Sequence, residues 1–177
     1  MFRGCTALRA SPKLPATRSA TGGGCYSFMF SGCTSLTAAS DINIINAAHM
    51  DEMYSGCTKL KKAPNINIKY NNVNYQWLLA GMFMNCTSLE TPPPKLHFTK
   101  IWHTTCYNMF KNCSKLTAAP DMSVDYVYNY GMCGMFAACP RLSSAANIHI
   151  GGKTIYSNAL NGTFMYGDTS LTAAPDL

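Results

Sequence analysis

The stretch Met29-Phe30-Ser31-Gly32-Cys33-Thr34-Ser35-Leu36 decides the fold, because its pattern of residue types returns along the whole chain. Four further copies keep a methionine, an aromatic residue, a cysteine and a leucine in the same places, and two looser copies follow. The seven copies begin at Met1, Met29, Met53, Met82, Met109, Met135 and Phe164. Their starts are 28, 24, 29, 27, 26 and 29 residues apart. A period of this length with a leucine in each unit predicts a leucine-rich type of solenoid, in which no unit buries its apolar face alone.

The repeats run through the whole chain, so we expect residues 1–177 to form a single solenoid array of about six and a half repeats. The chain starts and stops within a unit, and Met1 already occupies the methionine position of the repeat. Solenoids usually carry atypical polar caps at their ends. We therefore expect this array to be a segment of a longer protein.

The composition argues against two kinds of partner, membranes and nucleic acids. Hydrophobic residues make up 47% of the chain and charged residues 12%, and no apolar run approaches the roughly 20 residues of a membrane-spanning helix. We expect no membrane insertion. The net charge of +6 is spread along the chain, and its one tight group is Lys59, Lys61, Lys62 and Lys69. Such a group is more typical of a solvated face than of a nucleic-acid site, so we expect no nucleic-acid partner.

Two stretches of each unit predict strands. The Leu-Thr-Ala-Ala-Pro stretch that ends the block, as in residues 116–120, predicts a short strand stacked in parallel on its neighbours and closed by proline. An alternating segment follows and predicts a second short strand or extended edge. The alternating segments are Ile42-Asn43-Ile44, Ile66-Asn67-Ile68, Leu96-His97-Phe98, Met122-Ser123-Val124 and Ile148-His149-Ile150.

A short helix is predicted just before and within each block. Apolar residues stand three positions before the block methionine, as Leu79 does before Met82, and this spacing indicates one or two helical turns. The Gly or Asn that follows suits a left-handed helix cap. The cap positions are Gly32, Gly56, Asn85 and Asn112. The predicted fold is a right-handed solenoid of short parallel strands and short helical turns, with about 27 residues per coil.

Nine cysteines are present, and six of them occupy the same position of the repeat. These are Cys5, Cys33, Cys57, Cys86, Cys113 and Cys139. One cysteine per coil predicts a column of buried, reduced thiols that act as small apolar groups. Zinc sites need close ligand pairs such as Cys-x-x-Cys, and none occurs, so we expect no metal and no cofactor.

Residues for catalysis are scarce. His97, His103 and Cys106 fall in one unit and could form a metal cluster or a Cys-His pair, but no orienting carboxylate is evident. His49 and His149 stand alone. We therefore expect no enzyme and assign no catalytic residue.

The positive signal for function is aromatic. Tyr75, Trp102 and Tyr128 stand seven residues before three successive block starts, and Trp77 and Tyr130 stand five before. In stacked coils these positions form columns on a lateral face, and exposed Tyr and Trp bind partners at low entropic cost. An inward, purely structural role for one of the two columns remains the alternative. The candidate binding residues are Tyr75, Trp77, Trp102, Tyr128 and Tyr130, with Lys69 and Lys100 at the margin.

The block, the Leu-Thr-Ala-Ala-Pro stretch and the period together resemble the BspA-like leucine-rich repeat proteins of bacterial cell surfaces. The resemblance covers essentially the whole chain. It implies a surface or secreted protein that adheres to host or microbial proteins or glycans, located outside the cell or on the bacterial surface. Its motif is specific for architecture and weak for the ligand.

Two function classes follow. The first is a non-enzymatic adhesion module that binds a protein or glycan through the aromatic face. The second is a structural rod in a larger surface fibre or phage tail-type assembly, with a virion surface as its location and the flanking repeats as its partners.

Overall fold

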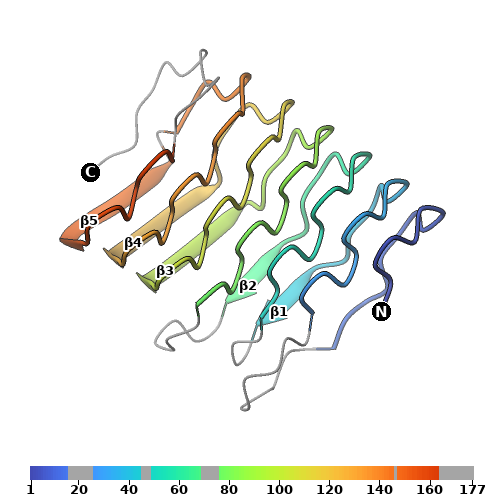
Figure 1. Cartoon of the computed structure of the whole chain (residues 1–177), viewed down its shortest axis with the longest axis horizontal. Coiled ribbons are helices and arrows are strands. Elements are labelled where there is room, and N and C mark those ends of the chain that lie inside the picture. The colour runs from blue at the N-terminus through green and yellow to red at the C-terminus, as the bar shows by residue number, and fades with distance from the viewer. Residues whose placement is uncertain (16–25, 45–48, 69–75, 146, 164–177) are drawn as a thin grey trace.

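A computed structural model describes residues 1–15, 26–44, 49–68, 76–145 and 147–163. Similar coils stack side by side along one axis, and each passes through the same corners (Figure 1). Paired residues of adjacent strands are 24 residues apart in one sheet and 26 or 28 in the other, so each coil places one strand beside the next. The chain is a parallel β-solenoid, as the repeat predicts.

The alternating segments form the strands. β1 (Ile42–Ile44) pairs with β2 (Ile66–Ile68), and β3 (Lys95–Ile101), β4 (Asp121–Val127) and β5 (Ile148–Ile155) form a second sheet in that order. All pairs are parallel, and the register between β4 and β5 shifts after Val124. Side chains alternate along the better-described strands: in β3, Leu96 and Phe98 are buried, whereas His97 and Thr99 are exposed. Period-two patterning therefore identified the sheet correctly.

The Leu-Thr-Ala-Ala-Pro stretch does not form the short strand that we expected in each coil. It contributes single parallel bridges, Ala10 with Ala38, Lys62 with Thr91 and Ala118 with Ser144. The amide of Ala119 donates to the carbonyl of Ser144 (3.0 Å), and the next residue is Pro120. Proline has no N–H to continue a ladder, so pairing stops after one bridge.

The predicted helical turns are wrong, because no helix occurs among the described residues. Linked turns replace them. The amide of Met82 donates within its coil to the carbonyl of Leu79 (3.2 Å), whereas the amide of the next residue, Phe83, donates to Met109 of the neighbouring coil (2.9 Å). An α-helix would direct every amide to a carbonyl four residues back in the same segment. Every second amide of this segment donates to the neighbouring coil, so these amides are not available for a helix and the segment forms linked turns instead.

The turns place left-handed residues four positions apart. Trp77, Gly81 and Asn85 have φ angles of 64°, 59° and 62°. Gly81 and Asn85 are the third residues of turns whose first and fourth residues are hydrogen-bonded, and this position of a type II turn favours Gly or Asn. The left-handed conformation predicted for Gly32, Gly56, Asn85 and Asn112 is confirmed. Its cause is a repeated turn instead of a helix cap.

An aromatic stack runs along the core. Its rings lie 5.4 to 5.7 Å apart, centroid to centroid, and are nearly parallel. The stacked residues are Phe2, Phe30, Tyr54, Phe83, Phe110 and Phe136. The block methionines and leucines from Met29 to Leu142 are buried with them. We also expected the repeat to bury every block methionine, aromatic residue and leucine. This expectation is wrong for the first copy: Met1 is 95% exposed, and Phe2 and Leu8 are partly buried, because only one neighbouring coil packs against them.

The cysteine column is also confirmed from the second copy onward. Cys33, Cys57, Cys86, Cys113 and Cys139 are buried, Cys5 is exposed, and none of the described cysteines forms a disulfide. Each buried thiol donates to the carbonyl of the aromatic residue in the preceding coil, at 3.0 to 3.2 Å. Burial raises the pKa of Cys57 to about 12 and that of Cys86 well above its usual value. These thiols pack in the core and each donates one hydrogen bond to the preceding coil. They are poor nucleophiles because they stay protonated.

The seventh copy begins one residue earlier than the sequence indicated. The amide of Phe136 donates to the carbonyl of Thr163 (2.9 Å), as the amide of Phe30 donates to Met53 (2.9 Å). Thr163 therefore occupies the methionine position, which we had given to Phe164. Its hydroxyl donates to the carbonyl of Met132 at 2.8 Å. This hydrogen bond explains how a buried polar residue is accepted there.

Candidate functional site

An aromatic ladder stands where the three long strands end. Trp102, Tyr128 and Tyr156 are the residues directly after β3, β4 and β5. The rings of Trp102 and Tyr128 stack with centroids 4.3 Å apart, and those of Tyr128 and Tyr156 lie 4.5 Å apart. The amide of Tyr128 donates to Ile101 (2.8 Å) and that of Tyr156 to Val127 (2.9 Å). Backbone pairing of the strands thus holds the three rings in register.

Sequence reasoning found two members of this ladder and missed Tyr156. Tyr156 stands seven residues before Thr163, just as Trp102 and Tyr128 stand seven before their block starts. Aligning the last copy on Phe164 displaced this count by one residue. The signal that could have found it is the pair Ile155-Tyr156, an aliphatic residue followed by an aromatic one, as in Ile101-Trp102 and Val127-Tyr128.

A lysine adjoins the ladder. Lys100 of β3 places its Nζ 5.6 Å from the ring centroid of Trp102 and 5.5 Å from that of Tyr126. Ammonium groups within about 6 Å of a ring centroid are attracted by the ring's electron-rich face. Lys100 thus lies beside one ring of the ladder.

The ladder presents ring edges more than ring faces. Trp102 and Tyr128 are half-buried, and Tyr156 is 42% exposed. A hydrogen bond with Tyr128 raises the pKa of the Tyr156 hydroxyl. Because stacking covers the facing sides of the rings, a partner approaching from the side meets hydroxyl groups, ring edges and the ammonium group of Lys100. Such a strip can bind hydroxyl and carboxylate groups.

The second predicted column is separate from the ladder. Trp77 and Tyr130 are 45% and 42% exposed, and both have left-handed backbones, with φ of 64° and 58°. Trp77 contacts Tyr107 of the next coil edge to face, with centroids 6.0 Å apart. The other two predicted residues, Tyr75 and Lys69, lie outside the described residues.

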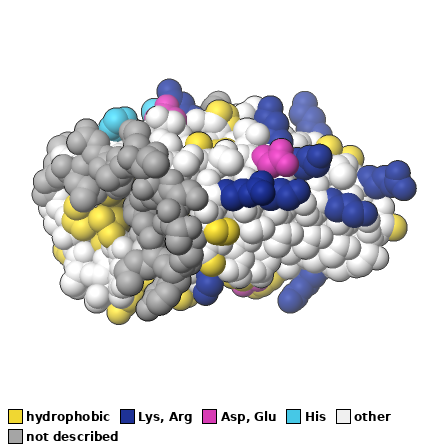
Figure 2. Space-filling view, turned by 90° about the horizontal axis from the view of Figure 1, so that it is seen from above, with side chains coloured by type: hydrophobic (Ala, Val, Ile, Leu, Met, Phe, Trp, Pro, Cys, Tyr) yellow, Lys and Arg dark blue, Asp and Glu magenta, His cyan; other side chains and the backbone are white. Residues whose placement is uncertain are grey.

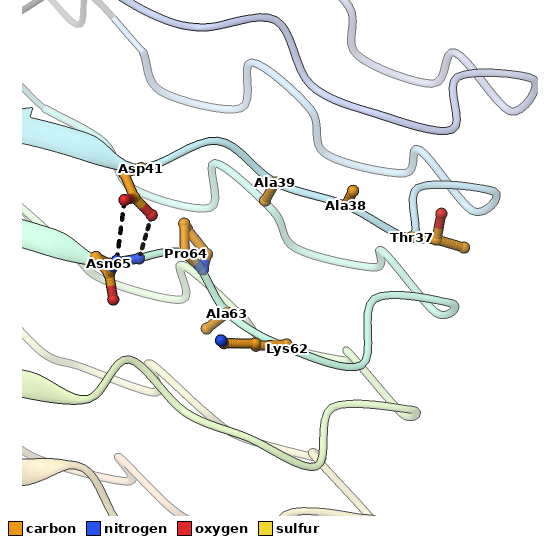
Figure 3. Close-up of a pocket in the computed structure, with 8 residues that line it drawn as sticks. All are labelled: Thr37, Ala38, Ala39, Asp41, Lys62, Ala63, Pro64 and Asn65. Atoms are coloured by element: carbon orange, nitrogen blue, oxygen red, sulfur yellow. Dashed lines mark hydrogen bonds between the residues drawn. The ribbon is translucent and has the colours of Figure 1, made fainter.

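A furrow follows the Ala-Ala-Pro corner. Figure 3 shows its central part, where residues 37–39 and Asp41 of one coil face residues 62–65 of the next. The space there is about 270 Å³. Asp41 accepts two hydrogen bonds from Asn65, at 2.9 and 3.0 Å, and the bond from the Asn65 side chain is the main cause of its lowered pKa. The carboxylate is thus occupied by coil stacking, which leaves a shallow furrow of small side chains.

Basic residues lie scattered over the surface. Figure 2 shows several Lys and Arg side chains spread over the face in view, with an acidic side chain among them. Lys59, Lys61 and Lys62 of the predicted basic group are exposed, as expected of a solvated face.

The structure does not assemble the histidine and cysteine cluster. His97 lies on the exposed side of β3, with its Nε2 3.4 Å from Oδ1 of Asp121, whereas Cys106 is fully buried. His103 packs against the ring of Tyr128 at 5.7 Å. Among the described residues, no group of three His, Cys, Asp or Glu side chains could hold a metal ion.

No helix in the described part of the chain is long and apolar enough to cross a membrane. Comparison with protein-family models and with curated proteins finds no match. A leucine-rich repeat protein from Bacteroides ovatus, solved by crystallography, is similar over 83% of this chain and 62% of its own length, with 16% identity and a TM-score of 0.24. The present chain thus spans less than two thirds of that protein. The solenoid assignment rests on the stacked coils themselves.

Proposed function

We propose that this chain is a non-enzymatic adhesion module of a bacterial surface or secreted protein, and that it binds a protein or glycan through the ladder of Trp102, Tyr128 and Tyr156. The observation that carries the proposal is the ladder with Lys100 at its edge. Three coils contribute equivalent positions, so modest contacts to each add up along one extended strip. The partner's side carries hydroxyl or carboxylate groups, which suit tyrosine hydroxyls and an ammonium group.

Two further points support this function. The repeat resembles that of BspA-like surface proteins, whose members adhere to host and microbial surfaces. The described thiols are buried or unbridged, and the described histidines do not converge on a cysteine or a carboxylate cluster. These points favour recognition over chemistry, and we propose a location outside the cell on the resemblance alone.

The test is binding to a glycan array and to immobilised host-matrix proteins. Lys100→Gln combined with Tyr156→Ala should weaken binding at least tenfold, because it removes the ammonium group and the most exposed ring of the ladder. The matched control is Lys95→Gln, which removes an exposed lysine from the start of the same strand. Equal binding by the double variant and the control would contradict the proposal.

A structural rod is the second candidate, favoured by the side chains that link coil to coil. Asn67 donates to Asn43 at 3.0 Å, and Asn112 donates to Asn85 at 2.8 Å. A structural rod would bind neither the glycans of the array nor the host-matrix proteins. Its sedimenting mass would increase only when it associates with further repeats. Sedimentation of the chain with and without its flanking repeats distinguishes the two functions.

A further inference from the structure

A small hollow lies on the turn side of the solenoid, away from the ladder contacts. Three successive coils line it: Asp51 and Glu52 from the first, Trp77, Ala80, Gly81 and Met84 from the second, and Tyr107 and Asn108 from the third. Its volume is about 110 Å³. Sites for whole small molecules measure about 300 to 1,000 Å³. The hollow therefore fits the head of one side chain.

Two aromatic rings form one wall. The ring of Trp77 meets that of Tyr107 at an interplanar angle of 72°. An edge-to-face contact covers the face of only one ring, and Trp77 is 45% exposed. Aromatic surface is thus available to a group that enters the hollow.

Two acidic residues, Asp51 and Glu52, also line the hollow. Asp51 accepts a hydrogen bond from the hydroxyl of Ser27. The side chain of Glu52 lies over Gly81, where a Cβ would stand 3.0 Å from Glu52 Cγ. Within the described ranges, neither carboxylate forms a salt bridge. Negative charge is therefore concentrated here in a chain whose net charge is +6.

One acidic residue and one aromatic residue of the hollow have an uncommon, left-handed backbone conformation. Glu52 and Trp77 have φ angles of 50° and 64°. Left-handed backbone is disfavoured for residues of this size, and such strain persists only where the surrounding structure enforces it. Glycine occupies the Glu52 position in three other coils, as Gly81, Gly134 and Gly162. The repeat alone does not require a charged side chain at this position.

We propose that this hollow binds the side chain of one arginine or lysine of a protein partner. The cation packs against the ring of Trp77, and its N–H groups donate to the carboxylates of Asp51 and Glu52. The proposal extends the proposed function, because it states the chemistry of a protein partner, but it does not require the ladder to bind.

The chain contains two tryptophans, so Trp102→Phe leaves Trp77 as the only indole fluorophore. In this background we would titrate N-acetyl-arginine amide, with N-acetyl-citrulline amide as its neutral counterpart. We expect the arginine compound alone to change the Trp77 emission in a saturable manner, and added salt to weaken the effect. Glu52→Gln should lower the affinity at least tenfold, whereas Glu90→Gln, an exposed acid on another corner, should not change it.

Each outcome decides the proposal. An equal response to citrulline, no response to arginine, or an unchanged affinity in both Glu52→Gln and Asp51→Asn would overturn it. A response to N-acetylglucosamine in place of arginine would assign the hollow to glycans and overturn it as well. Circular dichroism confirms that each variant is folded. Binding of the Glu52→Gln variant to the glycan array and host-matrix proteins tests the ladder independently of the hollow. Failure of the hollow to bind arginine is thereby distinguished from failure of the ladder to bind its partner.

Discussion

The two sides of each coil differ in how strictly they repeat. On the turn side, the linked turns keep the same ring stack, the same thiol contacts and the same left-handed positions from coil to coil. On the strand side, β1 and β2 have three residues each, whereas β3, β4 and β5 have seven, seven and eight. The described strands thus differ from coil to coil, whereas the turn side repeats. The turn side sets the geometry of the stack, and the strand side is free to carry the surface that differs between coils.

The register shift between β4 and β5 illustrates this freedom. Val124 pairs with Ile150, but Tyr126 pairs with Thr154, so β5 holds two more residues than β4 over this interval. The strand side accommodates them within a ladder that continues to Val127 and Ile155. The rings of Tyr128 and Tyr156 still meet after this shift. The comparison suggests three experiments.

The largest effect should come from emptying the turn-side core. Phe83 stacks between Tyr54 and Phe110, with centroids 5.7 and 5.5 Å away, and is fully buried. We expect Phe83→Ala to lower the free energy of unfolding by about 3 to 5 kcal/mol. Thr99→Ala, on the exposed side of β3, should change it by less than about 0.5 kcal/mol. Urea unfolding measures both, and similar losses in the two variants would contradict the difference between the two sides.

The thiol column should make stability fall at alkaline pH. Burial raises the pKa of Cys57 from 9.0 to about 12, so below pH 9 the thiol is protonated in both the folded and unfolded chains. Above pH 9 only the unfolded chain releases the proton, and this contribution to stability is lost progressively up to pH 12. Between pH 9 and 10, we expect the wild type to lose up to about 1.4 kcal/mol more than Cys57→Ala. Parallel pH profiles for the two proteins would exclude a protonated, buried thiol.

The smallest effect should come from the left-handed turn positions. A Cβ on Gly56 would lie 3.7 Å from Gly32, an ordinary contact, so the cost of Gly56→Ala is that of its φ angle of 72°. We expect a loss of about 1 kcal/mol. Ala138 already has a φ angle of 57°, and Ala138→Gly should raise stability by about 0.5 kcal/mol because relief of strain exceeds the added chain entropy. Thermal unfolding compares the two, and effects of the same sign would refute the assignment of strain.

Much of the fold was predictable because the repeat residues have a single physical role. A buried ring, a thiol and a leucine in every coil can be satisfied only by stacking, so their spacing indicated the solenoid and its core. The helical turn was not predictable from spacing. Leu79 and Met82 stand three apart in a helix and also in a hydrogen-bonded turn, and only the coil-to-coil bonds of residues such as Phe83 distinguish the two.

The candidate site was predictable in part. Counting back from the block placed Trp102 and Tyr128 in one column, and their rings do stack. Tyr156 could be assigned to the ladder only once the backbone register of Thr163 was known. The looser last copies of the repeat do not define that register from sequence. The hollow beside Trp77 was not found by counting. Asp51 and Tyr107 both stand two residues before a block start, but this position has no common chemistry from coil to coil, and Trp77 stands five before.

The sequence by itself determined that this chain is a stack of similar coils and which side chains form its core, because burial of the same residue types at a constant period has few other solutions. Tertiary structure alone decided where the amides of each turn donate, which ring of one coil meets which ring of the next, and which charges approach an aromatic wall. These depend on distances between coils, and a one-residue change in register moves them. Trp102 and Trp77 show the result: both are aromatic residues before a block, yet one joins a stacked ladder and the other lines a hollow with two carboxylates.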